Sequence, residues 1–168
     1  MPQAYLHLMS RAFTREEDNE SAIASIGERP VSAHRNLVTK KGLAAIDAEI
    51  SGLRAALAAA EQGAEREKVA LASRDLRYWL SRRESAELTL PEVGSDVVRF
   101  GMTVTLESED GKSVVWTIVG EDEADPSKGT ISHVSPMAQA LFGKAVGDVV
   151  AVNGKEWEIV GLKGDQAF

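Results

Sequence analysis

Two glutamates near the middle of the chain have a type and spacing that could hold a metal ion. Glu61 and Glu65 flank Gly63, and glycine readily adopts the left-handed backbone conformation that a chain reversal needs. Two carboxylates that converge across such a turn could bind a hard cation through their oxygen atoms. The alternative is an ordinary solvated turn, since Glu65 and Glu67 near a helix N-terminus also favour the helix dipole.

A second group of carboxylates lies between two predicted strands. The alternation of apolar and polar residues over 114–118 predicts a half-buried strand. Residues 121–129 are rich in acidic residues, proline and glycine, which predict a turn. Residues 130–134 predict a second strand. It is followed by Ser135 and Pro136, a favourable N-cap and first residue for a short helix.

An apolar seam predicts the elements that must position Glu61 and Glu65. Apolar residues recur at alternating spacings of three and four, which is typical of a coiled coil. They are Leu43, Ile46, Ile50, Leu53, Leu57, Ala60 and Ala64. After a reversal at Gly63, a second helix is predicted to run from about Ala64 to Leu88. The residues expected to face back to the first helix are Val69, Leu76, Trp79 and Leu80. The result is an antiparallel helical hairpin roughly 30–35 Å long.

Four arginines make the second predicted helix locally basic: Arg74, Arg77, Arg82 and Arg83. One interpretation is a solvated face that pairs with neighbouring acidic residues. The other is a surface that guides the hairpin along an acidic channel or contacts RNA.

The residues from 118 to 149 also follow the pattern of a known family. The matching words are Ile118-Val119-Gly120, Asp122-Glu123-Ala124-Asp125, Ile131-Ser132, Ser135-Pro136-Met137-Ala138, Ala140-Leu141, Gly143-Lys144 and Gly147-Asp148-Val149. Their order resembles the C-terminal domain of the bacterial Gre transcript-cleavage factors, GreA and GreB. Val38-Thr39 followed by Gly42-Leu43 also resembles the opening of the hairpin in this family.

We therefore predict an α+β protein with three parts. Residues 1–36 are expected to be a disordered tail, residues 37–90 a helical hairpin and residues 91–168 a sheet domain. The resemblance implies that the sheet domain is similar to FK506-binding proteins, with a twisted antiparallel sheet and one short helix. The expected core residues are Phe100, Trp116, Leu141, Phe142 and Trp157.

The resemblance implies that RNA polymerase is the partner and that the hairpin enters its secondary channel. In the family, two acidic residues at the hairpin tip help to hold the second catalytic magnesium ion of the polymerase. Here that pair aligns between Ala55 and Gly63, where Glu61 is the only carboxylate. The predicted function is regulation of transcription elongation without transcript cleavage and without enzymatic activity. Cleavage through Glu61, Glu65 and the polymerase magnesium is the alternative, and an isomerase or chaperone similar to FK506-binding proteins is a third.

The acidic turn and the residues before the short helix form the predicted polymerase-binding surface. Its residues are Asp122, Glu123, Asp125, Ser135 and Pro136. The alternative is a solvated acidic turn that has no partner.

Composition narrows the remaining function classes. Residues 91–168 carry six Lys/Arg and thirteen Asp/Glu, and an acidic domain repels phosphate backbones, so direct sequence-specific DNA binding is not expected. Without cysteine, and with three scattered histidines, the chain offers neither a thiolate zinc site nor a histidine cluster. No apolar run is long enough to cross a membrane, and a signal-peptide pattern is absent. We expect a cytoplasmic monomer without a cofactor of its own.

Overall fold

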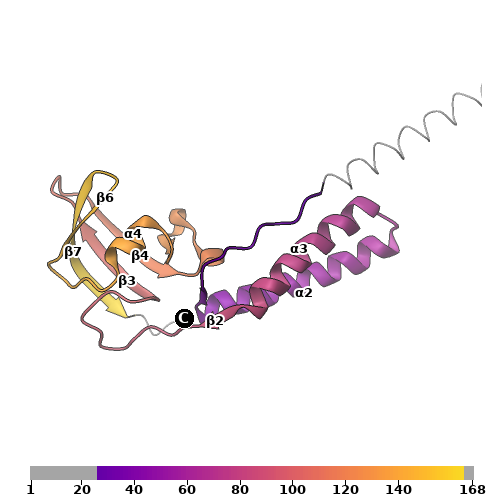
Figure 1. Ribbon diagram of the computed structural model, residues 1–168, viewed down its shortest axis with the longest axis horizontal. Coiled ribbons are helices and arrows are strands. Elements are labelled where there is room, and N and C mark those ends of the chain that lie inside the picture. Colours follow the sequence, from indigo (N-terminus) through magenta and orange to yellow (C-terminus); the bar gives the residue numbers. More distant parts are fainter. Residues whose placement is uncertain (1–25, 165–168) are drawn as a thin grey trace, which may run out of the picture. The chain divides into compact units, whose positions relative to one another are not determined.

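The computed structural model describes residues 26–164, which form two compact units (Figure 1). The hairpin unit comprises residues 26–32 and 47–82, and the sheet unit comprises residues 33–46 and 83–164. The division falls inside the two long helices, so the base of the hairpin belongs to the sheet unit. Residues 1–25 of the predicted tail lie outside the described residues.

Two helices, α2 (Lys40–Gln62) and α3 (Arg66–Glu84), form the predicted hairpin (Figure 1). The apolar seam of α2 is confirmed at Ile46 and Ile50, whose side chains are buried. Thr39 is the N-cap of α2, since its Oγ1 accepts a hydrogen bond from the amide N–H of Gly42 at 3.0 Å.

The seam of α3 differs from the predicted one at a single position. Val69, Leu76 and Trp79 are half-buried and Ala72 is buried, whereas Leu80 is 40% exposed. The prediction that Leu80 faces the first helix is therefore wrong. The buried side of α3 steps by three or four residues, and Leu80 lies one residue beyond Trp79, about 100° around the helix.

The reversal between the helices is a Schellman turn. The amide of Glu65 donates to the carbonyl of Ala60 at 2.9 Å, and the amide of Ala64 donates to the carbonyl of Glu61 at 3.1 Å. The left-handed residue is Ala64, with φ 53°, rather than the expected Gly63. A non-glycine residue in this conformation costs about 1 kcal/mol, a cost that the two hydrogen bonds offset.

A short parallel strand pair lies at the base of the hairpin. Strand β1 (Asn36–Val38) pairs with β2 (Ala86–Leu88), and the amide of Thr89 donates to the carbonyl of Val38 at 2.9 Å. The second helix therefore ends at Glu84 and does not reach Leu88 as predicted. The base of the hairpin begins at residue 36, which the sequence pattern places in the predicted tail.

Residues 26–32, also expected to be tail, make specific contacts within the hairpin unit. Glu28 forms an ion pair with Arg77, in which the Arg77 guanidinium donates to the carboxylate at 2.5 Å. The guanidinium of Arg29 lies 3.8 Å from the ring centroid of Tyr78, close enough for a cation–π interaction, and 3.6 Å from a carboxylate oxygen of Asp75. This segment therefore packs along α3.

The sheet unit contains a five-stranded sheet with the order β5-β4-β3-β7-β6. Its strands are β3 (Met102–Glu107), β4 (Ser113–Val119), β5 (Thr130–Ser132), β6 (Val149–Val152) and β7 (Lys155–Gly164). The α+β class is confirmed. One strand pair differs from the predicted antiparallel sheet, because β4 and β5 run parallel. Residues 120–129 form a crossover rather than a tight hairpin, which brings β5 back beside β4 in the same direction.

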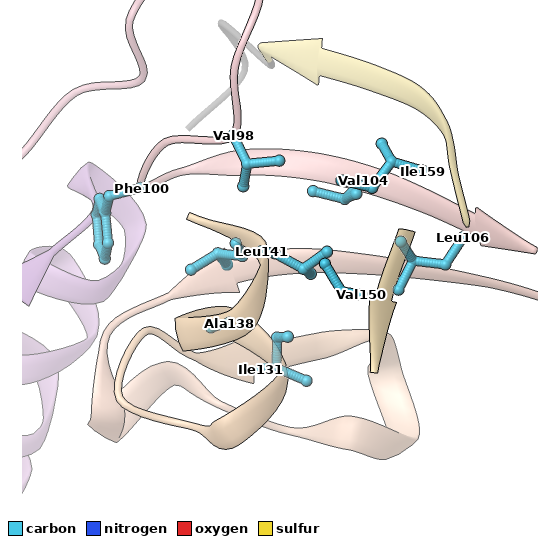
Figure 2. Packing of buried hydrophobic residues seen from close by; sticks show 10 residues of the cluster. Val98, Phe100, Val104, Leu106, Ile131, Ala138, Leu141, Val150 and Ile159 are labelled. Atoms are coloured by element: carbon cyan, nitrogen blue, oxygen red, sulfur yellow. The ribbon is translucent and has the colours of Figure 1, made fainter. Parts of the chain in front are cut away.

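The core lies between one face of this sheet and the short helix α4 (Pro136–Leu141) (Figure 2). Leu141 and Ala138 of α4 are fully buried against Val104, Ile118 and other residues of the sheet. Of the expected core residues, Phe100 and Leu141 are buried. The other three, Trp116, Phe142 and Trp157, are half-buried at its margin. The likeness to FK506-binding proteins stays a prediction.

Local signals in the sequence account for the turns around the core. Asn153 and Gly154 both have positive φ, as the tight turn between β6 and β7 requires. Ser135 caps α4 by accepting from the amide of Ala138, and Gly143 follows the helix with φ 76°. Among the described residues, the structure contains no helix that is both long and apolar enough to span a membrane.

Candidate interaction site

The acidic turn, residues 121–125, leaves the sheet at the carboxyl end of β4. It contains the 3-10 helix η1 (Glu121–Glu123) and leads into a second one, η2 (Pro126–Lys128). Since β5 runs parallel to β4 and pairs with its last residues, the segment after β5 leaves from the same edge of the sheet. The acidic turn and the start of α4 therefore lie at one edge, as the predicted surface requires.

The carboxylate of Glu123 contacts the base of the hairpin. Its Oε1 accepts from the amide of Thr39 at 2.9 Å, and its Oε2 accepts from the hydroxyl of Thr39 at 2.5 Å. Thr39 is only 2% exposed. Charge-assisted hydrogen bonds of this kind are roughly twice as strong as neutral ones. Glu123 therefore links the acidic turn to the first turn of α2, a contact that lies wholly within the sheet unit.

Two glycines make this close approach possible. A Cβ atom on Gly42 would lie 2.0 Å from Cδ and Oε1 of Glu123. A Cβ atom on Gly120 would lie 2.5 Å from the carbonyl oxygen of Leu37 in β1. No side chain fits at either position while the contact is intact. We call residues 35–42, 120–123 and His133 the junction.

Asp125 has a different role within the turn. Its Oδ1 accepts from the hydroxyl of Ser127 at 2.6 Å and from the amide of Ser127 at 3.1 Å. Its Oδ2 lies 2.9 Å from the ammonium group of Lys128. The hydrogen bonds from Ser127 and then Lys128 lower the pKa of the Asp125 carboxyl from 3.8 to about 2. This carboxylate therefore holds η2 in place and stays ionised well into the acidic range.

We expect Ser127→Ala to raise the pKa of Asp125 toward 3.8, because the hydroxyl is the main group that stabilises the carboxylate. The folded-state pKa lies below the ordinary value, so the carboxylate stabilises the fold above pH 3.8, and this contribution is lost as the pH falls to about 2. Carboxyl-carbon NMR titration measures the shift directly. Lys128→Met is the matched comparison and should produce a smaller rise. An unchanged pKa in Ser127→Ala would contradict the assignment.

Ser135 and Pro136 follow His133, a junction residue, in the sequence. The ring Nε2 of His133 donates to the carbonyl of Arg35 at 3.1 Å, and the side chain is 6% exposed. The hydroxyl of Ser135 accepts from the amide of Ala138 at 3.3 Å, whereas Pro136 is exposed. Of this pair, Pro136 is thus the residue that a partner can reach most readily.

Sequence reasoning found the acidic turn but missed the residues that it contacts. The residues missed are Thr39 as a partner of Glu123, the two glycines Gly42 and Gly120 that permit this contact, and His133, which bonds the carbonyl of Arg35. The pairing of Thr39 with Glu123 joins residues 84 positions apart, which no local pattern reveals.

At the hairpin tip, residues 61–67, one of the carboxylates contacts a basic residue. Glu65 forms an ion pair with Lys68, and its side chain packs against Gly63. Glu61 and Glu67 are exposed. Within residues 26–164 there is no cluster of three or more His, Asp and Glu side chains that could hold a metal ion.

The arginines of α3 are mostly engaged within the protein. Arg77 pairs with Glu28, and the Arg74 guanidinium lies 2.8 Å from Asp75. Arg82 is 1% exposed. These contacts favour the interpretation of a face neutralised by nearby carboxylates over a surface that guides the hairpin or contacts RNA.

Most of the sheet unit also matches a known protein family in its sequence. Residues 93–163 match the family model described as transcription elongation factor, GreA/GreB, C-terminal. The matched range covers the five-stranded sheet, the acidic turn and α4. Residues 93–163 are therefore similar to the C-terminal domain of the GreA/GreB factors. We call residues 93–163 the GreA/GreB domain.

Curated relatives of the GreA/GreB domain carry the same family name. Transcription elongation factor GreA of Desulfovibrio desulfuricans is 43% identical over 105 residues, which cover 59% of this chain and 65% of the relative. GreA of Bradyrhizobium diazoefficiens is 51% identical over 67 residues, which cover 39% of this chain and 43% of the relative. The chain thus spans less than two thirds of the length of these relatives.

Solved structures are similar at lower identity. GreA factor homolog 1 (Gfh1) of Thermus thermophilus is 21% identical with a TM-score of 0.39, and the match covers 78% of this chain and all of Gfh1. GreA/GreB from Nitrosomonas europaea is 23% identical with a TM-score of 0.36, over 76% of this chain and 98% of that protein.

Proposed function

We propose that the chain is an RNA polymerase-binding regulator of transcription elongation that acts through the secondary channel without stimulating transcript cleavage. It is a cytoplasmic monomer, it does not bind DNA sequence-specifically, and it is neither an enzyme nor dependent on its own cofactor. The observation that supports this function most strongly is a GreA/GreB domain connected to a helical hairpin in which Glu65, at the tip, forms an ion pair with Lys68.

The partner follows from the family and from the charge of the domain. The curated relatives are transcription elongation factors, a class of protein that works on RNA polymerase. Residues 91–168 carry thirteen acidic residues against six basic ones, so this part of the chain suits a basic protein surface better than a nucleic acid backbone. We propose that the contact is made by Asp122 and Asp125 of the acidic turn, together with Ser135 and Pro136.

The sequence predicts that Glu123 is part of the polymerase-binding surface, whereas in this proposal it holds the acidic turn against α2. Both of its carboxylate oxygens accept hydrogen bonds from Thr39, so replacing Glu123 would disturb the fold as well as any partner contact. Asp122 lies in the same turn as Glu123, and we therefore choose it as the probe of the surface.

We expect Asp122→Lys to weaken RNA polymerase binding by about tenfold, because a repulsive charge replaces an attractive one at the rim of the contact. Binding of the parent chain should also weaken as the salt concentration rises. Fluorescence anisotropy with core polymerase measures both effects. Glu109→Lys is the matched control, since it makes the same charge change at an exposed residue of the β3–β4 turn. Equal affinities of Asp122→Lys and Glu109→Lys would place the interface elsewhere.

The alternative of stimulated cleavage needs Glu61 and Glu65 to hold one magnesium ion together. The ion pair between Glu65 and Lys68 opposes this, because the ammonium group competes with a cation for the same carboxylate. The Schellman turn also fixes the backbone between the two glutamates. We therefore favour binding without cleavage.

A further inference from the structure

The first turn of α2 contains an incomplete helix-capping motif. In a capping box, the N-cap threonine bonds the amide of the third helical residue, and a glutamate at that third position bonds the amide of the N-cap residue. Here Thr39 makes the first of these bonds to Gly42, at 3.0 Å. Gly42 has no side chain and cannot make the second.

Glu123 makes the missing bond from a distant part of the chain. Its Oε1 accepts from the amide of Thr39 at 2.9 Å, although the two residues are 84 positions apart. The space that a side chain at position 42 would need is occupied by this same carboxylate. The first turn of α2 brings no acidic residue of its own, so Glu123 supplies the negative charge that a helix N-terminus favours.

We propose that Glu123 is a positioning residue that completes the capping box of α2 from the acidic turn, so that the start of the helix is fully formed only when the acidic turn is seated against it. The acidic turn then has two roles, since Asp122 and Asp125 contact the partner while Glu123 holds the base of the hairpin. The second consequence rests on the proposed function. A partner that binds the seated turn more tightly than the displaced turn also stabilises the start of α2. Because the two equilibria are coupled, seating of the turn raises the affinity for the partner by the same factor.

The capping contact is tested in the free, full-length chain by amide hydrogen exchange. Glu123→Ala should raise the exchange rates of the Thr39 and Gly42 amides by about tenfold or more, because hydrogen bonds to a charged group are lost. The Val104 and Leu106 amides in the central strand report global unfolding and should exchange as in the parent chain. Glu123→Gln keeps one acceptor and should give intermediate rates. Unchanged exchange at Thr39 in Glu123→Ala would overturn the proposal.

A double variant separates capping from positioning. Glu123→Ala combined with Gly42→Glu restores a capping box within α2, because the three atoms closest to a Cβ at position 42 all belong to Glu123. We expect the Gly42→Glu change to return slow exchange to the amide of Thr39. The amide at position 123, which donates to the carbonyl of Gly120 in the parent chain, should exchange faster than in the parent chain, because the turn has lost its contact. Recovery at both places would mean that Glu123 merely supports helix formation and would overturn the proposed link.

RNA polymerase provides the final readout. Bound polymerase should slow exchange at the start of α2 in the parent chain and have no such effect in the double variant. Equal protection in both proteins would contradict the link between the acidic turn and α2. If polymerase binds neither protein, the proposed function fails, while the exchange rates of the free chain still decide the role of Glu123.

Discussion

Ile50→Asp should unfold much of the helical hairpin. Ile50 is 6% exposed in the seam of α2, and a carboxylate placed there lacks a partner that could offset the cost of burying its charge. The expected loss is several kcal/mol, a large fraction of the stability of a small unit. Far-ultraviolet circular dichroism should show lost helix signal, while amides of β3 in the sheet unit remain protected from exchange.

The matched control is Ser51→Asp, which adds the same charge at an exposed neighbour on the same helix. It should change stability by less than about 0.5 kcal/mol. If Ile50→Asp removes protection in β3 together with the helix signal, the two units do not fold independently and the division of the chain is wrong.

Gly42→Ala should destabilise the junction, although alanine is normally better than glycine in a helix. The new Cβ atom would lie 2.0 Å from the Glu123 carboxylate, so that side chain would have to move away from Thr39. Loss of its hydrogen bonds costs about 1.5–3 kcal/mol, more than the roughly 0.5–1 kcal/mol gained from the better helix former. Urea denaturation followed by circular dichroism measures the net change.

Gly52→Ala isolates the helix propensity from the contact. Gly52 lies in the same helix and has open space around its Cα, so alanine there should stabilise the chain by about 0.5–1 kcal/mol. Opposite signs for the two glycine substitutions are the expected result. Equal stabilisation by both would show that Glu123 can leave Thr39 without cost.

Local patterns in the sequence were enough to predict most of the secondary structure. The seam through Ile46 and Ile50 followed from heptad spacing, and the turn at Asn153 and Gly154 followed from the need for positive φ. The errors arose where a local pattern has two solutions. Leu80 and Trp79 are adjacent apolar residues, and only the packing of α3 decides which of them is buried.

The site was harder to predict because its contacts join distant residues. From its sequence neighbours alone, Glu123 is expected to be a solvated carboxylate in an acidic run. Its hydrogen bonds to Thr39 depend on how β1 packs beside the end of β4. The contacts of Glu28 and Arg29 with α3 have the same origin, since neither residue lies in a recognisable apolar pattern. Charge and motif located the acidic turn, but only the fold showed which of its carboxylates faces the protein.

The hairpin tip determines whether binding leads to chemistry. A carboxylate that assists a metal ion must be placed to within about 0.2 Å of its required distance. Glu65 is held by Lys68, and Glu61 is the only carboxylate in the aligned window. A protein that binds the channel in this way would exclude active cleavage factors by competition.

The most direct test of this account is transcript cleavage in backtracked elongation complexes. With radiolabelled RNA and magnesium, the full-length chain alone should leave the RNA 3′ end intact, and adding it before an active GreA should slow cleavage in proportion to its occupancy of the polymerase. Anisotropy measurements on the same complexes establish that the chain is bound. Shortened RNA that appears with the chain alone and disappears with Glu61→Ala or Glu65→Ala would contradict the account.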